Sequence, residues 1–360
     1  MLSWRSPGHP QAGGAEVLTH ETLRRAVERG HDVTWFSAMW AGAAPTEVID
    51  GIRIVRRGRQ WTVHAQAWRW LRGRLGDFDI VVDQVNTLPF LTPAYVPREQ
   101  RRLYIFQTAR EYWWRQTRGL FRLAAPIGYL LEPWYLRAYR TTRAVTISAS
   151  TRDELAALGL PPEQIAIIPM ANTFTPLAEL DEKPAGVRVV IVGRLEPAKH
   201  VEQGIAAFAV LQQRIPDARL DIVGSGTPEY RRRLEQEIAA DGVHGVTFHG
   251  RVDEERKHEL MRAAHLHVFT SHREGWGLTV TEAAALGTAS VGYDVPGVRD
   301  SINDPTRLVA RGDTTGLGEL MCRLLEDPAR FEAARRSAWE DARRLSYEAT
   351  TDAFIEALGV

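Results

Sequence analysis

The sequence predicts an α/β protein built from two domains, each with a mainly parallel β-sheet. Short apolar runs alternate with amphipathic helical segments along the chain, which is typical of parallel α/β layers. At 360 residues, 44% of them hydrophobic, the chain is too long for one ordinary core and can fill two. Thr173–Gly186, with two prolines and a cluster of acids, predicts the linker between them.

Ten apolar runs predict the strands of the two sheets. In the first half they are residues 33–36, 52–55, 80–82, 103–106 and 144–147. In the second half they are residues 189–192, 220–223, 246–248, 266–269 and 289–292. We therefore expect an N-terminal domain over residues 1–175 and a C-terminal domain over residues 176–340, followed by a helical segment over residues 341–360.

Cysteine content and hydropathy restrict the protein class. The single cysteine, Cys322, excludes a disulfide framework and a thiolate zinc site, and it fits a reducing compartment. No apolar stretch approaches the length of a membrane span, and the N-terminus lacks a signal-peptide pattern. We therefore expect a cytoplasmic protein.

The charges are unevenly distributed although the formal net charge is zero. Residues 1–180 hold 22 basic and 16 acidic groups, and residues 181–360 hold 23 basic and 29 acidic groups. The positive half is the one expected to meet an anionic surface. No recognised binding motif accompanies this charge, so the sequence does not support a nucleic-acid partner.

The most informative segment is SHREGWGLTVTEAAALG, residues 271–287. It predicts a glycine turn after a buried strand and then a helix over residues 278–286. A helix N-terminus behind Gly275 and Gly277 can receive a phosphate, because its N–H groups are free and no Cβ blocks the backbone. Glu282, one turn deeper, can accept hydrogen bonds only, which suits a ribose diol beside a diphosphate. The alternative is that Glu282 is a solvated helix residue and Glu274 an ordinary loop residue.

A second segment, VRVVIVGRLEPAKH, is a strand that ends at Gly193 and is followed by Arg194 and Lys199. A guanidinium and an ammonium on one loop suit a pyrophosphate. Only three of the 45 basic residues are lysines, so Lys199 does not come from a common surface pool. The alternative is a strand-end turn with solvated charges.

These segments, taken in order with LDIVGSGTPEY, VTFHGRVD and GTASVGYDVPGVRDSI, resemble the C-terminal half of retaining glycosyltransferases of family four, the group of glycogen synthases and mannosyltransferases. The first half is similar more loosely, through WRSPGHPQAGGAE, FQTAREYWW and TISASTRDEL. The resemblance implies the GT-B fold, in which two Rossmann-like domains face each other across a cleft and a C-terminal helix crosses back to the first domain. The first would bind the acceptor and the second the nucleotide-sugar donor. Relatives usually open with a full apolar strand, whereas only Met1–Trp4 precede the polar turn here.

The resemblance also implies residue roles. Arg194 and Lys199 would neutralise the departing diphosphate, and Glu274 would contact the donor sugar. Glu282 would hold the ribose. Further donor contacts would come from Gly13, Gly14, Gly193, Arg251, Val252, Gly275, Trp276, Gly277 and Leu278. Fixed positive charge at the leaving group requires no metal, so no metal and no cofactor are expected.

One position departs from the family pattern. Relatives commonly have histidine before the Gln of the segment that here reads Phe106, Gln107, Arg110 and Glu111 on the acceptor side. A phenyl ring can neither hydrogen-bond a hydroxyl nor carry a proton. Phe106 therefore predicts either a donor with a less polar, deoxygenated sugar, which we favour, or a normal donor held with less help from this position.

Other sites fit less well. IVGSGTPE has Glu229 where a dinucleotide-binding fingerprint needs its third glycine. Asp77 and Asp79 form an Asp-x-Asp pair, which holds a metal in other glycosyltransferases, but a turn leading into a strand is the simpler explanation. The 11 histidines show no metal-ligand spacing.

Residues 113–143 combine six arginines, one acid and seven aromatic residues. A basic face beside aromatics is attracted to an anionic leaflet, which would make the protein peripheral to the inner face of a membrane. The alternative is an arginine-rich helical pair packed on its own domain.

Three functions remain open from the sequence. The chain can be a retaining transferase that moves a sugar from a nucleotide diphosphate to a glycan, a lipid-linked acceptor or a small molecule. It can be an epimerase or hydrolase of sugar nucleotides on the same fold, or a sugar-nucleotide-binding subunit with little catalysis. The four charged residues Arg194, Lys199, Glu274 and Glu282 favour the transferase.

Overall fold

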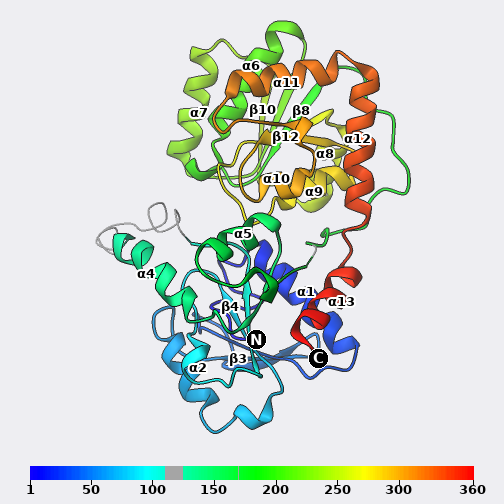
Figure 1. Ribbon diagram of the computed structural model, residues 1–360. Coiled ribbons are helices and arrows are strands. Elements are labelled where there is room, and N and C mark those ends of the chain that lie inside the picture. Colours follow the sequence, from blue (N-terminus) through cyan, green and yellow to red (C-terminus); the bar gives the residue numbers. More distant parts are fainter. Residues whose placement is uncertain (110–124, 169) are drawn as a thin grey trace. The chain divides into compact units, whose positions relative to one another are not determined.

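The computed structural model describes residues 1–109, 125–168 and 170–360 (Figure 1). The chain forms two compact units. Unit 1 comprises Met1–Ala171 and Ser346–Val360, and unit 2 comprises Asn172–Leu345. The sequence analysis places the domain boundaries after residues 175 and 340, whereas the compact units change at residues 171 and 345.

Unit 1 is built on two groups of strands, in the orders β2-β3-β1 and β4-β5-β6-β7. Its strands are β1 (Thr34–Ser37), β2 (Thr46–Ile49), β3 (Ile52–Arg56), β4 (Val81–Val85), β5 (Arg101–Ile105), β6 (Arg143–Thr146) and β7 (Ile165–Ile167). All neighbours pair in parallel except β2 and β3.

The first residues of the chain join these two groups of strands. Leu2 makes parallel bridges to Phe36 and to Asp83. Its N–H donates to Val82 O at 2.7 Å, and its carbonyl accepts from Gln84 N at 2.9 Å. The short apolar start therefore occupies the position between β1 and β4, with only one residue in register.

The helices of unit 1 include segments from both ends of the sequence. They are α1 (Gly14–Glu28), α2 (Val63–Leu71), α4 (Ala125–Arg137), α5 (Ala149–Ala157) and α13 (Tyr347–Leu358). Arg25 Nε lies 3.0 Å from Glu348 Oε1, which ties α1 to α13. On the same helix the Phe354 ring packs 5.2 Å from that of Tyr104 in β5. The final helix thus belongs to unit 1, as the fold class implies.

Sequence reasoning located all ten strands it proposed but missed β2, β7 and β13 (Leu308–Val309). The β2–β3 hairpin had a readable signal. Asp50 and Gly51 connect the strands with φ angles of 48° and 78°, and an Asp-Gly pair between β-branched residues is a strong hairpin indicator. The other two missed strands have only three and two residues, too short for a periodic pattern.

Unit 2 contains a six-stranded parallel sheet in the order β10-β9-β8-β11-β12-β13. Besides β13, its strands are β8 (Arg188–Val192), β9 (Arg219–Val223), β10 (Val246–Gly250), β11 (Leu266–Phe269) and β12 (Ala289–Tyr293). Its helices are α6 (Val201–Arg214), α7 (Pro228–Ala240), α8 (Glu254–Ala263), α9 (Leu278–Ala285), α10 (Val298–Ile302), α11 (Thr314–Leu325) and α12 (Pro328–Arg343).

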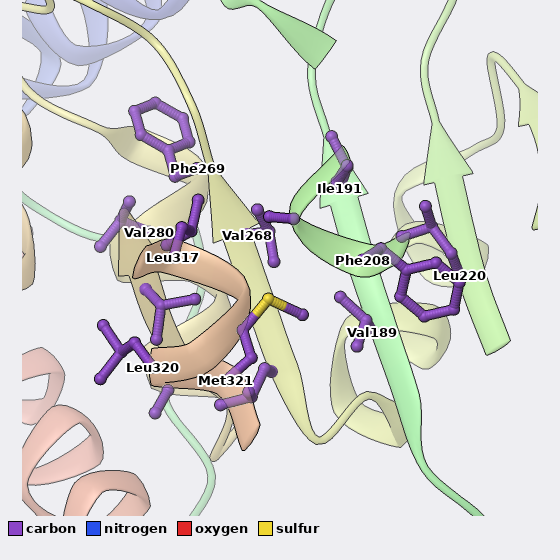
Figure 2. Packing of buried hydrophobic residues seen from close by; sticks show 14 of the residues in the cluster. Val189, Ile191, Phe208, Leu220, Val268, Phe269, Val280, Leu317, Leu320 and Met321 are labelled. Atoms are coloured by element: carbon purple, nitrogen blue, oxygen red, sulfur yellow. The ribbon is translucent and has the colours of Figure 1, made fainter. Parts of the chain in front are cut away.

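The core of unit 2 holds the central strands in place, and the candidate site residues lie in the loops that follow these strands. Val189, Leu220 and Val268 come from β8, β9 and β11, and Phe208 from α6 and Met321 from α11 pack on them; each is at most 1% exposed (Figure 2). Because these strands are buried on both faces, they read as continuous apolar runs, which is why the sequence located them well.

The predicted linker, Thr173–Gly186, is part of unit 2. Leu177 N donates to Ala285 O at 3.0 Å, and Lys183 Nζ donates to Arg262 O at 2.8 Å. The segment therefore forms a strap on unit 2, and the compact unit that contains it begins at Asn172.

Candidate active site

The predicted donor residues of unit 2 follow the carboxyl ends of neighbouring strands. Gly193, Arg194 and Lys199 follow β8, and the double-glutamate segment follows β11, which pairs directly with β8. Because parallel strands end at the same edge of a sheet, the two loops meet there. A small hollow at this edge is lined by Gly193, Arg194, Lys199, Phe269, Thr270 and Ser271, together with four apolar strand and helix residues.

Lys199 and Glu274 form an ion pair across these loops. The side chains remain 23% and 14% exposed, respectively. The Thr270 hydroxyl donates to Lys199 O at 3.0 Å, so the loop backbone is fixed while the ammonium faces the hollow. An ammonium paired with a carboxylate at a partly open site can exchange that carboxylate for an anionic ligand.

Arg194 is more loosely placed than Lys199. Its guanidinium lies 3.2 Å from Glu196, and its side chain is 70% exposed. The two predicted diphosphate cations thus come from one loop but differ in exposure, since Arg194 extends into solvent and Lys199 is held beside Glu274.

The N-terminus of α9 is open toward this loop. Gly277 is the N-cap and supplies no side-chain cap, so first-turn N–H groups are available to an anion. Gly297, with φ of 80°, presses on the loop so closely that a Cβ would lie 2.1 Å from Glu274 O. Nearby, Trp276 Nε1 is buried without a hydrogen-bond partner among the described residues. The loop from Gly275 to Leu278 therefore contains one buried donor with no described partner, beside a helix start that has no side-chain cap.

Glu282 is buried, with only 4% of the residue exposed. One carboxylate oxygen accepts from the Thr173 hydroxyl at 2.9 Å, and the other lies 3.1 Å from Lys257 Nζ. This excludes the alternative of a solvated helix glutamate. Burial alone would lower the pKa of Lys257, but the carboxylates of Glu282 and Glu254 outweigh it and raise that pKa.

Two of the predicted donor contacts lie next to this carboxylate network. Arg251 and Val252 follow β10 and directly precede α8, on which Lys257 lies. The Asp253 side chain accepts from Arg256 N at 2.8 Å and so caps α8. The sequence did not point to Lys257, because Glu282, the partner that connects it to the site, is on a different helix.

A stacked histidine pair was also missed. The rings of His200 and His272 lie 3.6 Å apart at 18°. His272 is anchored by Gln203 at 2.8 Å and by Arg311 at 3.1 Å. His200 comes one residue after Lys199, and His272 comes two residues before Glu274, so their positions in the sequence could have indicated a role at the site. The stacked rings join the two loops that carry the Lys199–Glu274 ion pair.

In unit 1, Gly13 and Gly14 start α1. The Gly13 N–H donates to Glu16 Oε2 at 2.7 Å, and Arg5 Nε lies 2.8 Å from the other oxygen of Glu16. A carboxylate therefore occupies this helix N-terminus, with Arg5 balancing its charge.

Phe106 follows β5 and is 8% exposed. Its ring packs 4.6 Å from that of Tyr104, and its carbonyl accepts from the Thr151 hydroxyl at 3.1 Å. Gln107 beside it is half-buried. Arg110 and Glu111 lie outside the described residues. That the Phe106 ring reaches a sugar, or sets its polarity, stays a prediction.

Within residues 1–109, 125–168 and 170–360, no three His, Cys, Asp or Glu side chains are grouped so that they could hold a metal ion. In those ranges, no helix has the length and apolar character needed to cross a bilayer.

Both halves of the chain match known families. Residues 12–171 match the description "Glycosyltransferase Family 4", and residues 178–349 match "Glycosyl transferases group 1". The chain is 31% identical to D-inositol 3-phosphate glycosyltransferase 2 of Catenulispora acidiphila, over 96% of this chain and 90% of that protein. It is 28% identical to a glycogen synthase of Mycobacterium tuberculosis, over 96% and 89%.

Solved structures of other proteins have the same fold. Sucrose-phosphate synthase from Thermosynechococcus elongatus superimposes with a TM-score of 0.76 at 20% identity, over 99% of this chain and 96% of that one. With the two parallel-sheet units, the open α9 terminus and the Lys199–Glu274 pair in place, these comparisons show that the chain belongs to the family-four glycosyltransferases and is an enzyme of the GT-B fold.

Proposed function

We propose that this glycosyltransferase takes its sugar from a nucleotide-diphosphate donor and retains the anomeric configuration, without a metal ion. The observation that carries the proposal is the Lys199–Glu274 pair beside the uncapped N-terminus of α9. A diphosphate at this edge would receive N–H groups from α9 and charge from Lys199 and Arg194.

The reaction would proceed at the anomeric carbon of the donor. The bond from that carbon to the diphosphate oxygen breaks as the acceptor hydroxyl attacks from the same face, and the hydroxyl proton passes to the departing phosphate. Lys199 would leave Glu274 for the developing phosphate charge, and fixed cations there stabilise the transition state more than the ground state. Glu274, released from Lys199, can then accept hydrogen bonds from sugar hydroxyls.

Glu282 would hold the ribose. A carboxylate offers about four acceptor positions, and Thr173 and Lys257 occupy two of them. The remaining positions suit the two ribose hydroxyls, and the backbone at Arg251 and Val252 lies at the start of the neighbouring helix to meet the base.

The acceptor is a glycan, a lipid-linked sugar acceptor or a small molecule. The names of two relatives support the small-molecule and glycan classes, since one is named for inositol phosphate and another for glycogen. The enzyme would act in the cytoplasm, with unit 1 contributing the acceptor side.

The test has two stages. A thermal-shift panel of UDP, GDP, ADP and their sugars should identify one donor, because a ligand at a hundred times its Kd stabilises by about 2.7 kcal/mol. NMR of the product formed from that donor should then show a glycoside with the donor's anomeric configuration. An inverted product contradicts retention, loss of activity in chelator contradicts metal independence, and altered free sugar or no product would indicate an epimerase, a hydrolase or a binding subunit.

A further inference from the structure

Helix α2 of unit 1 and the turn just before it expose two tryptophans. Val63, Ala67 and Leu71 are at most 1% exposed and face the core. Trp61, just before the helix, is 64% exposed and Trp68 is 42% exposed. An exposed indole keeps a large apolar ring in water, so two indoles this close in the chain indicate a contact surface.

The charge around these rings has one sign. Residues 51–76 contain seven arginines and no aspartate or glutamate. Arg56 is the buried member of this group and pairs with Glu47, while Arg69 and Arg72 are exposed on α2. The Arg72 guanidinium lies 5.7 Å from the Trp68 ring centroid. The outer side of α2 therefore places exposed indole rings beside Arg69 and Arg72, for which no ion pair is found among the described residues.

This surface continues toward α4 through a loop. His64 Nε2 lies 3.4 Å from Leu88 O, and the Tyr135 hydroxyl donates to Thr87 O at 3.0 Å. Leu88 and Leu91 in this loop are 38% and 47% exposed. Helices α2 and α4 lie along the same side of unit 1 in Figure 1.

Helix α4 adds the same chemistry. Leu130 and Trp134 are 65% and 69% exposed, and the Arg137 guanidinium lies 5.7 Å from the Trp134 ring. The single acid of this helix, Glu132, is 1% exposed and accepts from Ala109 N at 2.6 Å. The outward side of α4 thus shows apolar and basic groups, whereas its carboxylate is turned inward.

We propose that this α2–α4 surface docks unit 1 on an anionic lipid bilayer. Indoles and leucines would enter the headgroup region, while the arginines pair with lipid phosphates. Single-stranded RNA suits the surface less well, because exposed leucines offer no ring on which bases can stack. Docking does not use the donor site. Among the acceptor classes it favours a lipid-linked one, an extension that rests on the proposed function.

Co-sedimentation of the full chain with phosphatidylcholine vesicles, with and without phosphatidylglycerol, tests the proposal. The wild type should sediment only with the anionic vesicles and be released by salt. Replacing Trp61 and Trp68 by serine should weaken binding at least tenfold. Arg69→Gln with Arg72→Gln should weaken it about thirtyfold, at about 1 kcal/mol per arginine near the surface.

A matched control comes from unit 2. Arg232 and Arg233 are exposed on α7, and changing both to glutamine should leave vesicle binding unchanged. All variants should keep the wild-type Tm and the nucleotide-induced thermal shift, which separates lost docking from lost folding and from failure of the donor site. Absence of vesicle binding at low salt, equal loss in the control, or binding to RNA but not to vesicles would overturn the proposal.

Discussion

The two lysine–glutamate pairs of unit 2 use the same chemistry in different surroundings. Lys199–Glu274 joins two loops, and its side chains are 23% and 14% exposed. Lys257–Glu282 joins helices α8 and α9, at 15% and 6% exposed, and is held by further bonds from Thr173 and to Glu254. A partly exposed pair between two loops can separate for a ligand more readily than a pair buried within a network. We therefore expect Lys199 to take part in the chemistry and Lys257 to shape the nucleotide site.

The largest expected effect is on turnover. Lys199→Met should lower kcat at saturating donor by roughly tenfold to a hundredfold, because a charge-assisted hydrogen bond to the leaving diphosphate, about 1.5 to 3 kcal/mol, is lost. Lys257→Met should change kcat by less than about threefold, and Arg323→Met on the exposed side of α11 should not change it. Steady-state kinetics measure kcat for each variant. An equal loss of kcat in Lys199→Met and Lys257→Met would contradict the proposed difference between the two lysines.

For stability, Lys257→Met should have a larger effect than Lys199→Met, the reverse of their order for kcat. Lys257→Met leaves the Glu282 carboxylate buried with only Thr173, so the free energy of unfolding should fall by about 1 to 3 kcal/mol. Lys199→Met should cost less than about 1 kcal/mol, since its pair reaches solvent. Urea denaturation measures both. The double variant Lys257→Met with Glu282→Gln should recover part of the lost free energy of unfolding. If it recovers none, the unpaired Glu282 carboxylate is not the cause of the loss.

A smaller effect is expected in nucleotide discrimination. Glu282→Gln keeps the shape of the side chain but replaces one acceptor oxygen with a donor. Calorimetry should show about tenfold weaker binding of the ribonucleotide that the wild type prefers, with little change for its 2′,3′-dideoxy analogue. Glu274→Gln serves as the control and should leave that ratio as in the wild type. Parallel weakening of both nucleotides by Glu282→Gln would place the ribose elsewhere.

The smallest effect belongs to Arg194. Its side chain is 70% exposed and pairs only with its neighbour Glu196 among the described ion pairs, so solvent screens it in the free enzyme. Arg194→Ala should lower kcat by less than tenfold, below the effect of Lys199→Met. Raising the salt concentration should lower the kcat of the wild type toward that of the variant. A loss as large as that of Lys199→Met would show that Arg194 becomes buried on donor binding.

The features predicted correctly from the sequence are those that a local pattern of residues encodes. Fully buried strands such as β11 read as continuous apolar runs, and the glycine turn before α9 carries its own conformational signal. The sequence did not predict the Lys257–Glu282 pair, because 25 residues separate the partners and no spacing rule connects two helices. It also did not predict that Glu282 would be buried, since burial depends on the strap from residue 173. Leu2 shows the same limit, because a single residue between β1 and β4 has no periodicity to read.

The return of α13 to unit 1 has a consequence for synthesis on the ribosome. Tyr104 in the middle of unit 1 completes its ring contacts with Phe354, and Arg102 Nε donates to Leu358 O at 2.7 Å. Unit 2 is continuous from Asn172 to Leu345 and can close as soon as it has left the exit tunnel. Unit 1, although made first, must wait for the last helix, so the half of the enzyme translated earliest is the last to reach its final packing.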